Sequence, residues 1–119
     1  MVGFAPPTAE AAGLVTVWLN VVPEHEQDLN DWYAREHLAQ VVALPGFVRA
    51  RRYNAVGANP RYLTAYELTD RDAFESPEGL QARKTPWTAK MRSLFFNTRR
   101  RMCRLITPTM THEQALGQK

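Results

Sequence analysis

Apolar and polar positions alternate with the two-residue period of a β-strand in several segments of the chain. Residues 14–22 show it most clearly, with one aliphatic face and one mixed face: Val15, Val17, Leu19 and Val21 against Thr16, Trp18 and Asn20. Residues 47–53 and 61–68 have the same period. Residues 98–106 also favour a strand, although their mixed pattern does not define an inward face. We therefore expect four strands.

The spacing changes to that of a helix between the first and second strands. Residues 24–44 contain no glycine or proline, Pro23 suits a first helical turn, and Pro45 and Gly46 end the segment. One face carries aromatic and polar side chains as well as aliphatic ones: Leu29, Trp32, Tyr33, Glu36, His37, Gln40, Val41 and Leu44. A second helical region is expected to be broken, because Asp70, Ser76 and Thr85 each precede a short helical run, of which 86–95 is the most regular.

The resulting order of strands and helices is βαββαβ, which is typical of a ferredoxin-like α+β fold with a four-stranded antiparallel sheet. A chain of 119 residues with 45% apolar residues supports one hydrophobic core. We expect a single domain over residues 14–107, with a flexible N-terminal segment at 1–13 and a flexible tail at 108–119.

Two helices can cover only one face of such a sheet. If the valine side of the first strand meets the helices, six side chains face the other way: Thr16, Trp18, Asn20, Arg49, Arg51 and Tyr53. This face is too aromatic to leave wholly to water and too polar for a dry core. We therefore expect a homodimer, a dimeric α+β barrel in which the partner's sheet closes a small-molecule cleft.

Composition adds several expected absences. The net charge of +3 is too small to indicate nucleic-acid binding, and no segment has the length and apolarity of a membrane span or a secretory signal. Cys103 is the only cysteine, which fits a cytoplasmic protein. His25, His37 and His112 lack the spacing of metal ligands, and no glycine-rich phosphate loop occurs. We expect no metal and no cofactor, with haem left open because one histidine can be an axial ligand.

Residues 31–53 resemble the corresponding helix and strand of EthD-like and related dimeric α+β barrel proteins. The resemblance rests on Trp32, on His37 five residues later, and on Pro45 and Gly46 before a strand that carries Arg49 and Arg51. It implies a superfamily of cofactor-free cyclases, isomerases and lyases, small monooxygenases and haem-handling proteins. It also implies a site between helix and sheet, with His37 at the position of the motif histidine.

His37 is the first candidate for catalysis, since the ordinary pKa of imidazole suits general acid or base work near neutrality. Trp32 and Tyr33 share its helix face and would partly exclude water, while Glu36 would either orient the ring or face solvent. Tyr66 is the second candidate, as a donor to a developing oxyanion. The alternative for His37 is a packed histidine that only braces the helix, and for Tyr66 it is packing within a strand.

Arg49 and Arg51 point the same way on one strand and could hold a carboxylate or phenolate, or form salt bridges across the dimer. The full set of candidate substrate-binding residues is Trp18, Asn20, Trp32, Tyr33, Arg49, Arg51, Tyr53, Tyr62 and Trp87. These residues favour a cofactor-independent enzyme of the lyase, isomerase or cyclase type that acts on a small aromatic or anionic metabolite. A non-catalytic binding protein with the same cleft, and a haem- or oxygen-handling protein, are the alternatives.

Overall fold

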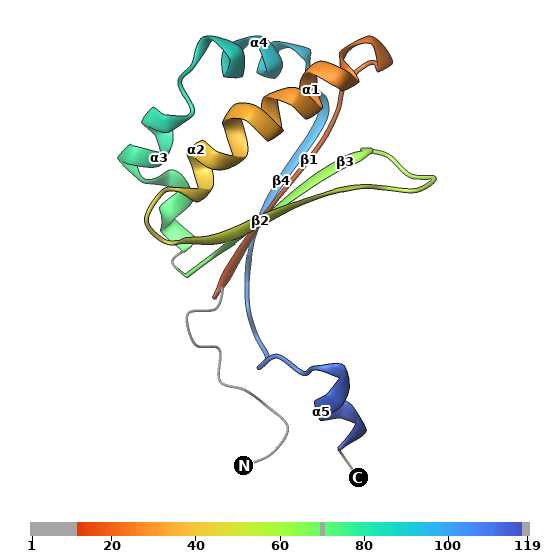
Figure 1. Cartoon of the computed structure of the whole chain (residues 1–119), viewed down its shortest axis with the longest axis vertical. Coiled ribbons are helices and arrows are strands. Elements are labelled where there is room, and N and C mark those ends of the chain that lie inside the picture. Colours follow the sequence, from red (N-terminus) through yellow and green to blue (C-terminus); the bar gives the residue numbers. More distant parts are fainter. Residues whose placement is uncertain (1–11, 70, 118–119) are drawn as a thin grey trace.

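The computed structural model describes residues 12–69 and 71–117, so most of the expected N-terminal segment lies outside the described residues. Four strands form an antiparallel sheet in the order β2-β3-β1-β4, and the helices that connect the strands lie on one face of it (Figure 1). The strands are β1 (Gly13–Asn20), β2 (Phe47–Asn54), β3 (Tyr62–Leu68) and β4 (Phe96–Arg104). The predicted ferredoxin-like α+β fold is confirmed.

The first helical region begins at Pro23 and is continuous but not uniform. It consists of η1 (Pro23–His25), α1 (Glu26–Trp32), the π-helical turn η2 (Tyr33–His37) and α2 (Leu38–Val42). Gly46 follows with a φ of 92°, a conformation that suits glycine in the turn into β2. The predicted helix is confirmed, but the π-helical turn inside it was not predicted.

The second helical region is broken, as predicted. It contains η3 (Arg71–Glu75), α3 (Pro77–Ala82) and α4 (Pro86–Leu94). Ser76 and Thr85 cap the last two helices, because their hydroxyl groups accept hydrogen bonds from the backbone N–H groups of Gly79 and Thr88. Each cap is followed by proline at the first helical position, where no N–H is needed.

The core lies between the helices and one face of the sheet. Alternate residues of β3 are buried there, and Val15 and Leu19 of β1 share the face. Two clusters form the core. The first is Leu19, Val21, Leu29, Trp32, Tyr33, Tyr62 and Met91, and the second is Val15, Val41, Tyr66, Leu68, Ala73 and Phe74. The valine face of β1 therefore meets the helices, as expected.

The other face of the sheet carries no helix. Trp18, Arg49, Arg51 and Tyr53 lie on it, as the alternation predicted. Asn20, which was expected on this face as well, does not lie open on it. The pairing of β1 with β4 is irregular between Trp18 and Asn20, and the Asn20 side chain is buried where β3 begins. Its Oδ1 accepts a hydrogen bond from the backbone N–H of Arg61 at 2.6 Å, so Asn20 holds the hairpin end.

The chain beyond β4 extends away from the sheet and the helices (Figure 1). It ends in the short helix α5 (His112–Leu116), which Thr111 and Gln114 close with reciprocal capping hydrogen bonds. The tail expected at 108–119 thus contains a helix within its described part. No helix in residues 12–69 and 71–117 has the length and apolarity needed to cross a membrane.

We expect Leu29→Ala to lower the free energy of unfolding by about 2–5 kcal/mol, because it leaves a cavity where α1 packs on the sheet. Leu29 is fully buried, whereas Val56 in the β2–β3 loop is 96% exposed. Val56→Ala is therefore the matched control and should change the free energy by less than about 0.5 kcal/mol. Urea unfolding followed by circular dichroism measures both, and equal effects would contradict this account of the core.

Candidate functional site

A cavity of about 290 Å³ lies between the helices and the sheet. This volume is at the lower end of the range for small-molecule pockets. Its walls combine aromatic side chains with three arginines and one histidine: Trp32, Tyr33, Tyr66, Phe74 and Phe95, with Arg83, Arg92, Arg100 and His37. The lining comes from every layer of the fold, because α1, η2, η3, α4, β1, β3 and β4 all contribute to it.

The π-helical turn places His37 in this cavity. Residues five apart on an α-helix point about 140° away from each other. In η2 the backbone N–H of Leu38 instead bonds to the carbonyl oxygen of Tyr33, five residues back, which widens the turn. The rings of Trp32 and His37 consequently stack, with centroids 4.1 Å apart and planes inclined by 16°. The ring of Tyr33 meets His37 edge-on at 5.4 Å.

Glu36 fixes the indole of Trp32. Its Oε2 accepts hydrogen bonds from Trp32 Nε1 at 3.2 Å, from Thr85 Oγ1 at 2.7 Å and from Thr88 Oγ1 at 3.4 Å. Thr85 and Thr88 belong to the first turn of α4, so the carboxylate ties α1 and η2 to α4. Glu36 was expected either to orient the His37 ring or to face solvent, and it does neither. It holds the indole of Trp32, which in turn stacks on His37.

His37 is buried and uncharged at neutral pH. Burial, together with the charges of Arg92 and Arg83, lowers its pKa from 6.5 to about 3. The sequence-based assumption of an ordinary imidazole pKa is therefore wrong. Nδ1 of His37 is buried and has no hydrogen-bond partner among the described residues. A histidine that served only as a brace would be expected to have this nitrogen satisfied.

Two tyrosines beside His37 keep their protons. Burial raises the pKa of Tyr66 well above its usual value, and burial also raises the pKa of Tyr33. Tyr33 hydrogen-bonds with Thr64, and the Arg52 guanidinium lies 4.0 Å from its ring centroid. Tyr66 lines the cavity with His37, so a phenol and a neutral imidazole face the same space.

The arginines of the cavity were not predicted as site residues. Arg83 is buried and donates from Nη1 to the carbonyl oxygen of Phe74 at 2.8 Å. Arg100 forms an ion pair with Glu75, whereas no carboxylate in the described residues pairs with Arg83 or Arg92. Sequence alone gave no signal for Arg83 and Arg92, because they lie in the broken helical region and reach the cavity only through the fold.

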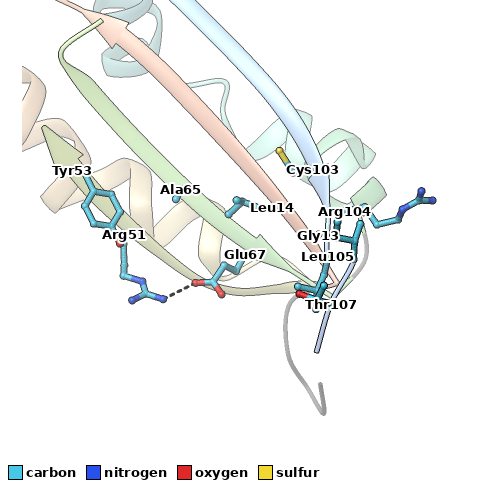
Figure 2. Close-up of a pocket in the computed structure, with 11 residues that line it drawn as sticks. Gly13, Leu14, Arg51, Tyr53, Ala65, Glu67, Cys103, Arg104, Leu105 and Thr107 are labelled. Atoms are coloured by element: carbon cyan, nitrogen blue, oxygen red, sulfur yellow. Dashed lines mark hydrogen bonds and ion pairs between the residues drawn. The ribbon is translucent and has the colours of Figure 1, made fainter. Parts of the chain in front are cut away.

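A second cavity, of about 490 Å³, lies on the uncovered face and is lined by Arg51 and Tyr53 (Figure 2). Glu67 stands between the two predicted arginines, 2.5 Å from Arg49 and 3.0 Å from Arg51. The expected salt bridges are thus present, but their partner is on the adjacent strand of the same chain. The predicted site is divided, with its histidine and its arginine pair on opposite faces of the sheet.

Other predicted residues also lie apart from the helix-side cavity. Trp87 donates to Asp28 at 3.2 Å between α4 and α1, and Tyr62 lies beside Arg61 and Arg52 at the hairpin end. Of the eleven candidates, four line this cavity: His37, Tyr66, Trp32 and Tyr33. No group of three or more histidine, cysteine or acidic residues that could hold a metal occurs in the described part of the chain.

No protein-family model matches the chain, and no curated protein does. Solved structures do. A mutant of SnoaB, a cofactor-independent oxygenase from Streptomyces nogalater, is 22% identical over 82% of this chain and 96% of that chain, with a TM-score of 0.60. A mutant of MhuD, a haem degrader of Mycobacterium tuberculosis, is 15% identical over 83% of this chain and 99% of that chain, with a TM-score of 0.62.

An EthD family protein from Bacillus halodurans is 16% identical over 79% of this chain and 99% of that chain, with a TM-score of 0.56. At these identities the likeness establishes a shared fold and not a shared reaction. The resemblance to EthD-like and related dimeric α+β barrel proteins, predicted from residues 31–53, is confirmed at the level of the fold.

We expect the depressed pKa of His37 to make the protein less stable in acid. The unfolded chain takes up a proton on this residue near pH 6.5, whereas the folded chain does so only near pH 3. The free energy of unfolding should therefore fall as the pH decreases from 6.5 towards 3. His37→Gln should flatten this part of the profile, and His112→Gln, at an exposed position, should leave it unchanged.

Urea unfolding at a series of pH values measures this dependence, and the slopes rather than the absolute stabilities are compared between variants. An imidazole titration of His37 by NMR with an ordinary midpoint of 6.5 would contradict the prediction.

Proposed function

We propose that this protein is a cofactor-independent enzyme that performs general acid/base chemistry on a small aromatic metabolite in the helix-side cavity. The observation that carries the proposal is the state of His37, whose neutral imidazole lies in a ligand-sized cavity with a buried Nδ1 that has no partner. Trp32 and Tyr33 shield this ring from water and hold its orientation.

In the proposed step, imidazole accepts a proton from an acidic C–H or O–H group of the substrate. The bond to that proton breaks, an N–H bond forms, and the electron pair stays on the substrate as an enolate or phenolate. Tyr66 retains its proton and can donate to the developing oxyanion. The new negative charge raises the pKa of His37, because an opposite charge beside the ring favours imidazolium. Transfer of the proton back to another carbon completes an isomerisation. In a cyclisation the carbanion instead attacks a carbonyl carbon, whose oxygen takes up the proton, and in an elimination the bond to the leaving group breaks and that group takes the proton.

Oxygenation at the same cavity is a second candidate, favoured by the likeness to SnoaB, which is described as a cofactor-independent oxygenase. A haem-handling role and a non-catalytic binding role stay open as outcomes of the tests. SnoaB is described as a cofactor-independent oxygenase and MhuD as a haem degrader, so the fold alone does not choose between these reactions.

We also propose that the protein is a homodimer. The uncovered sheet face holds a cavity lined partly by Leu14, Ala65 and Tyr53, which is a poor surface to leave to water. The segment after β4 adds exposed apolar side chains, including Ile106 at 85% and Leu116 at 69% exposure. A partner sheet on this face would cover the cavity, as in a dimeric α+β barrel.

We expect His37→Ala to lower turnover by about 100-fold to 10,000-fold, the usual loss for a positioned proton-transfer group. The assay is a panel of phenolic and enolisable ring compounds, followed by absorbance and by dioxygen consumption. His112→Ala is the control and should keep full activity. A wild-type protein that binds these compounds without converting any of them would favour the binding role, and Soret absorbance after purification would favour haem handling.

We expect light scattering over a dilution series to give the mass of a dimer. Trp18→Arg on the uncovered face should shift the protein towards monomer, because it adds a charge where the sheets would meet. Val56→Arg, in the exposed β2–β3 loop, is the control and should stay dimeric. A wild-type monomer at micromolar concentration would contradict the shared barrel.

A further inference from the structure

We infer that Arg83 and Arg92 form an anion-binding subsite in the helix-side cavity, and that the ligand is a planar aromatic anion, a carboxylate or a phenolate. This inference rests on the proposed function, because it concerns the same cavity. It names the class of molecule that enters, and it holds for a catalytic and for a binding protein.

Arg83 is a buried cation for which the described residues supply no carboxylate partner. Its exposed fraction is 5%, and its guanidinium lies 4.2 Å from the ring centroid of Phe74. The hydrogen bond to the carbonyl oxygen of Phe74 uses one of the five N–H donors of the guanidinium. A buried charge normally has a counter-ion, because transfer from water to a protein interior is unfavourable without one.

Arg92 brings a second positive charge to the same cavity. It lies in the last turn of α4 and lines the cavity together with Arg83. The two charges act on each other and on His37, since Arg92 lowers the pKa of Arg83 and both lower that of His37. An anion bound between them would turn this repulsion into attraction.

The nearby carboxylates are already engaged. Glu36 accepts hydrogen bonds from Trp32, Thr85 and Thr88, and Glu75 forms an ion pair with Arg100. Among the described residues that line the cavity there is no aspartate or glutamate. The positive charge of Arg83 and Arg92 is therefore left for a ligand.

On the uncovered face, in contrast, the arginines have a carboxylate partner. Arg49 and Arg51 share Glu67, so one of the two positive charges that the sequence assigned to ligand binding is neutralised within the sheet. The preference for anions therefore belongs to the helix side. Arg49 and Arg51 therefore provide matched control positions for Arg83 and Arg92, because each pair can be replaced in the same chain.

The remaining walls specify a flat ring. Aromatic surfaces are offered by the stacked Trp32 and His37, by the buried Tyr66 and by Phe74. The guanidinium groups of Arg83 and Arg100 lie 4.2 Å and 4.8 Å from the ring centroid of Phe74. A volume of about 290 Å³ suits one or two fused rings. A guanidinium fork matches the planar geometry of a carboxylate or of a phenolate oxygen on such a ring.

Calorimetry on the full chain with 2-naphthoate, 2-naphthamide and inorganic phosphate tests the inference. We expect naphthoate to bind at least about tenfold more tightly than the amide, with the difference shrinking as salt is added. Arg83→Gln and Arg92→Gln should each remove most of this discrimination while leaving amide binding in place. Arg49→Gln and Arg51→Gln should leave naphthoate binding unchanged.

Equal binding of naphthoate and naphthamide would overturn the subsite, as would loss of discrimination in Arg51→Gln rather than in Arg92→Gln. Phosphate that binds as tightly as naphthoate would overturn the requirement for a ring. Arg92 is exposed, so Arg92→Gln carries the test if Arg83→Gln fails to fold. The two proposals can fail separately: a wild-type protein that binds naphthoate more tightly than naphthamide but shows no turnover would end the catalytic proposal alone.

Discussion

The stacking of Trp32 on His37 is the contact on which the helix-side cavity depends, and it requires the π-helical turn at Tyr33–His37. A regular α-helix would turn these two rings away from each other, and His37 would leave the cavity. The widened turn is stabilised from outside the helix, because Glu36 joins the indole of Trp32 to the hydroxyl groups that begin α4. The cap of one helix therefore helps to orient the imidazole of another.

The sheet separates two chemically different spaces. On the helix side, buried aromatic rings surround a neutral imidazole and two arginines without a carboxylate partner among the described residues. On the uncovered side, Glu67 pairs with Arg49 and Arg51 and leaves a surface suited to another sheet. Strand alternation produces this separation, since neighbouring residues of one strand point to opposite faces. The ligand site and the proposed dimer interface can thus be distinct within one small domain.

The fold could be predicted from local patterns, whereas much of the site could not. Two-residue alternation placed Val15 and Leu19 inside and Arg49, Arg51 and Tyr53 outside, because one face of each strand is buried. The π-helical turn leaves no comparable mark, since Leu29, Trp32, Tyr33, Glu36 and His37 recur at the spacing of a regular α-helix. Glu67 pairs with the two arginines only through the register of β2 and β3, which the sequence does not display.

The burial of His37 Nδ1 and of the Arg83 charge weakens the fold, because both groups lose hydration without a full set of partners. A purely structural core would be more stable with apolar side chains at these positions. The surrounding contacts hold the two groups in place nonetheless: Trp32 covers the imidazole, and the Phe74 ring and carbonyl oxygen hold the guanidinium. Local instability maintained by well-packed neighbours is typical of a functional site rather than of a packing defect. An anion with an aromatic ring would pair with the Arg83 guanidinium, which would link the proposed acid/base role of His37 to the charge proposed to select its ligand.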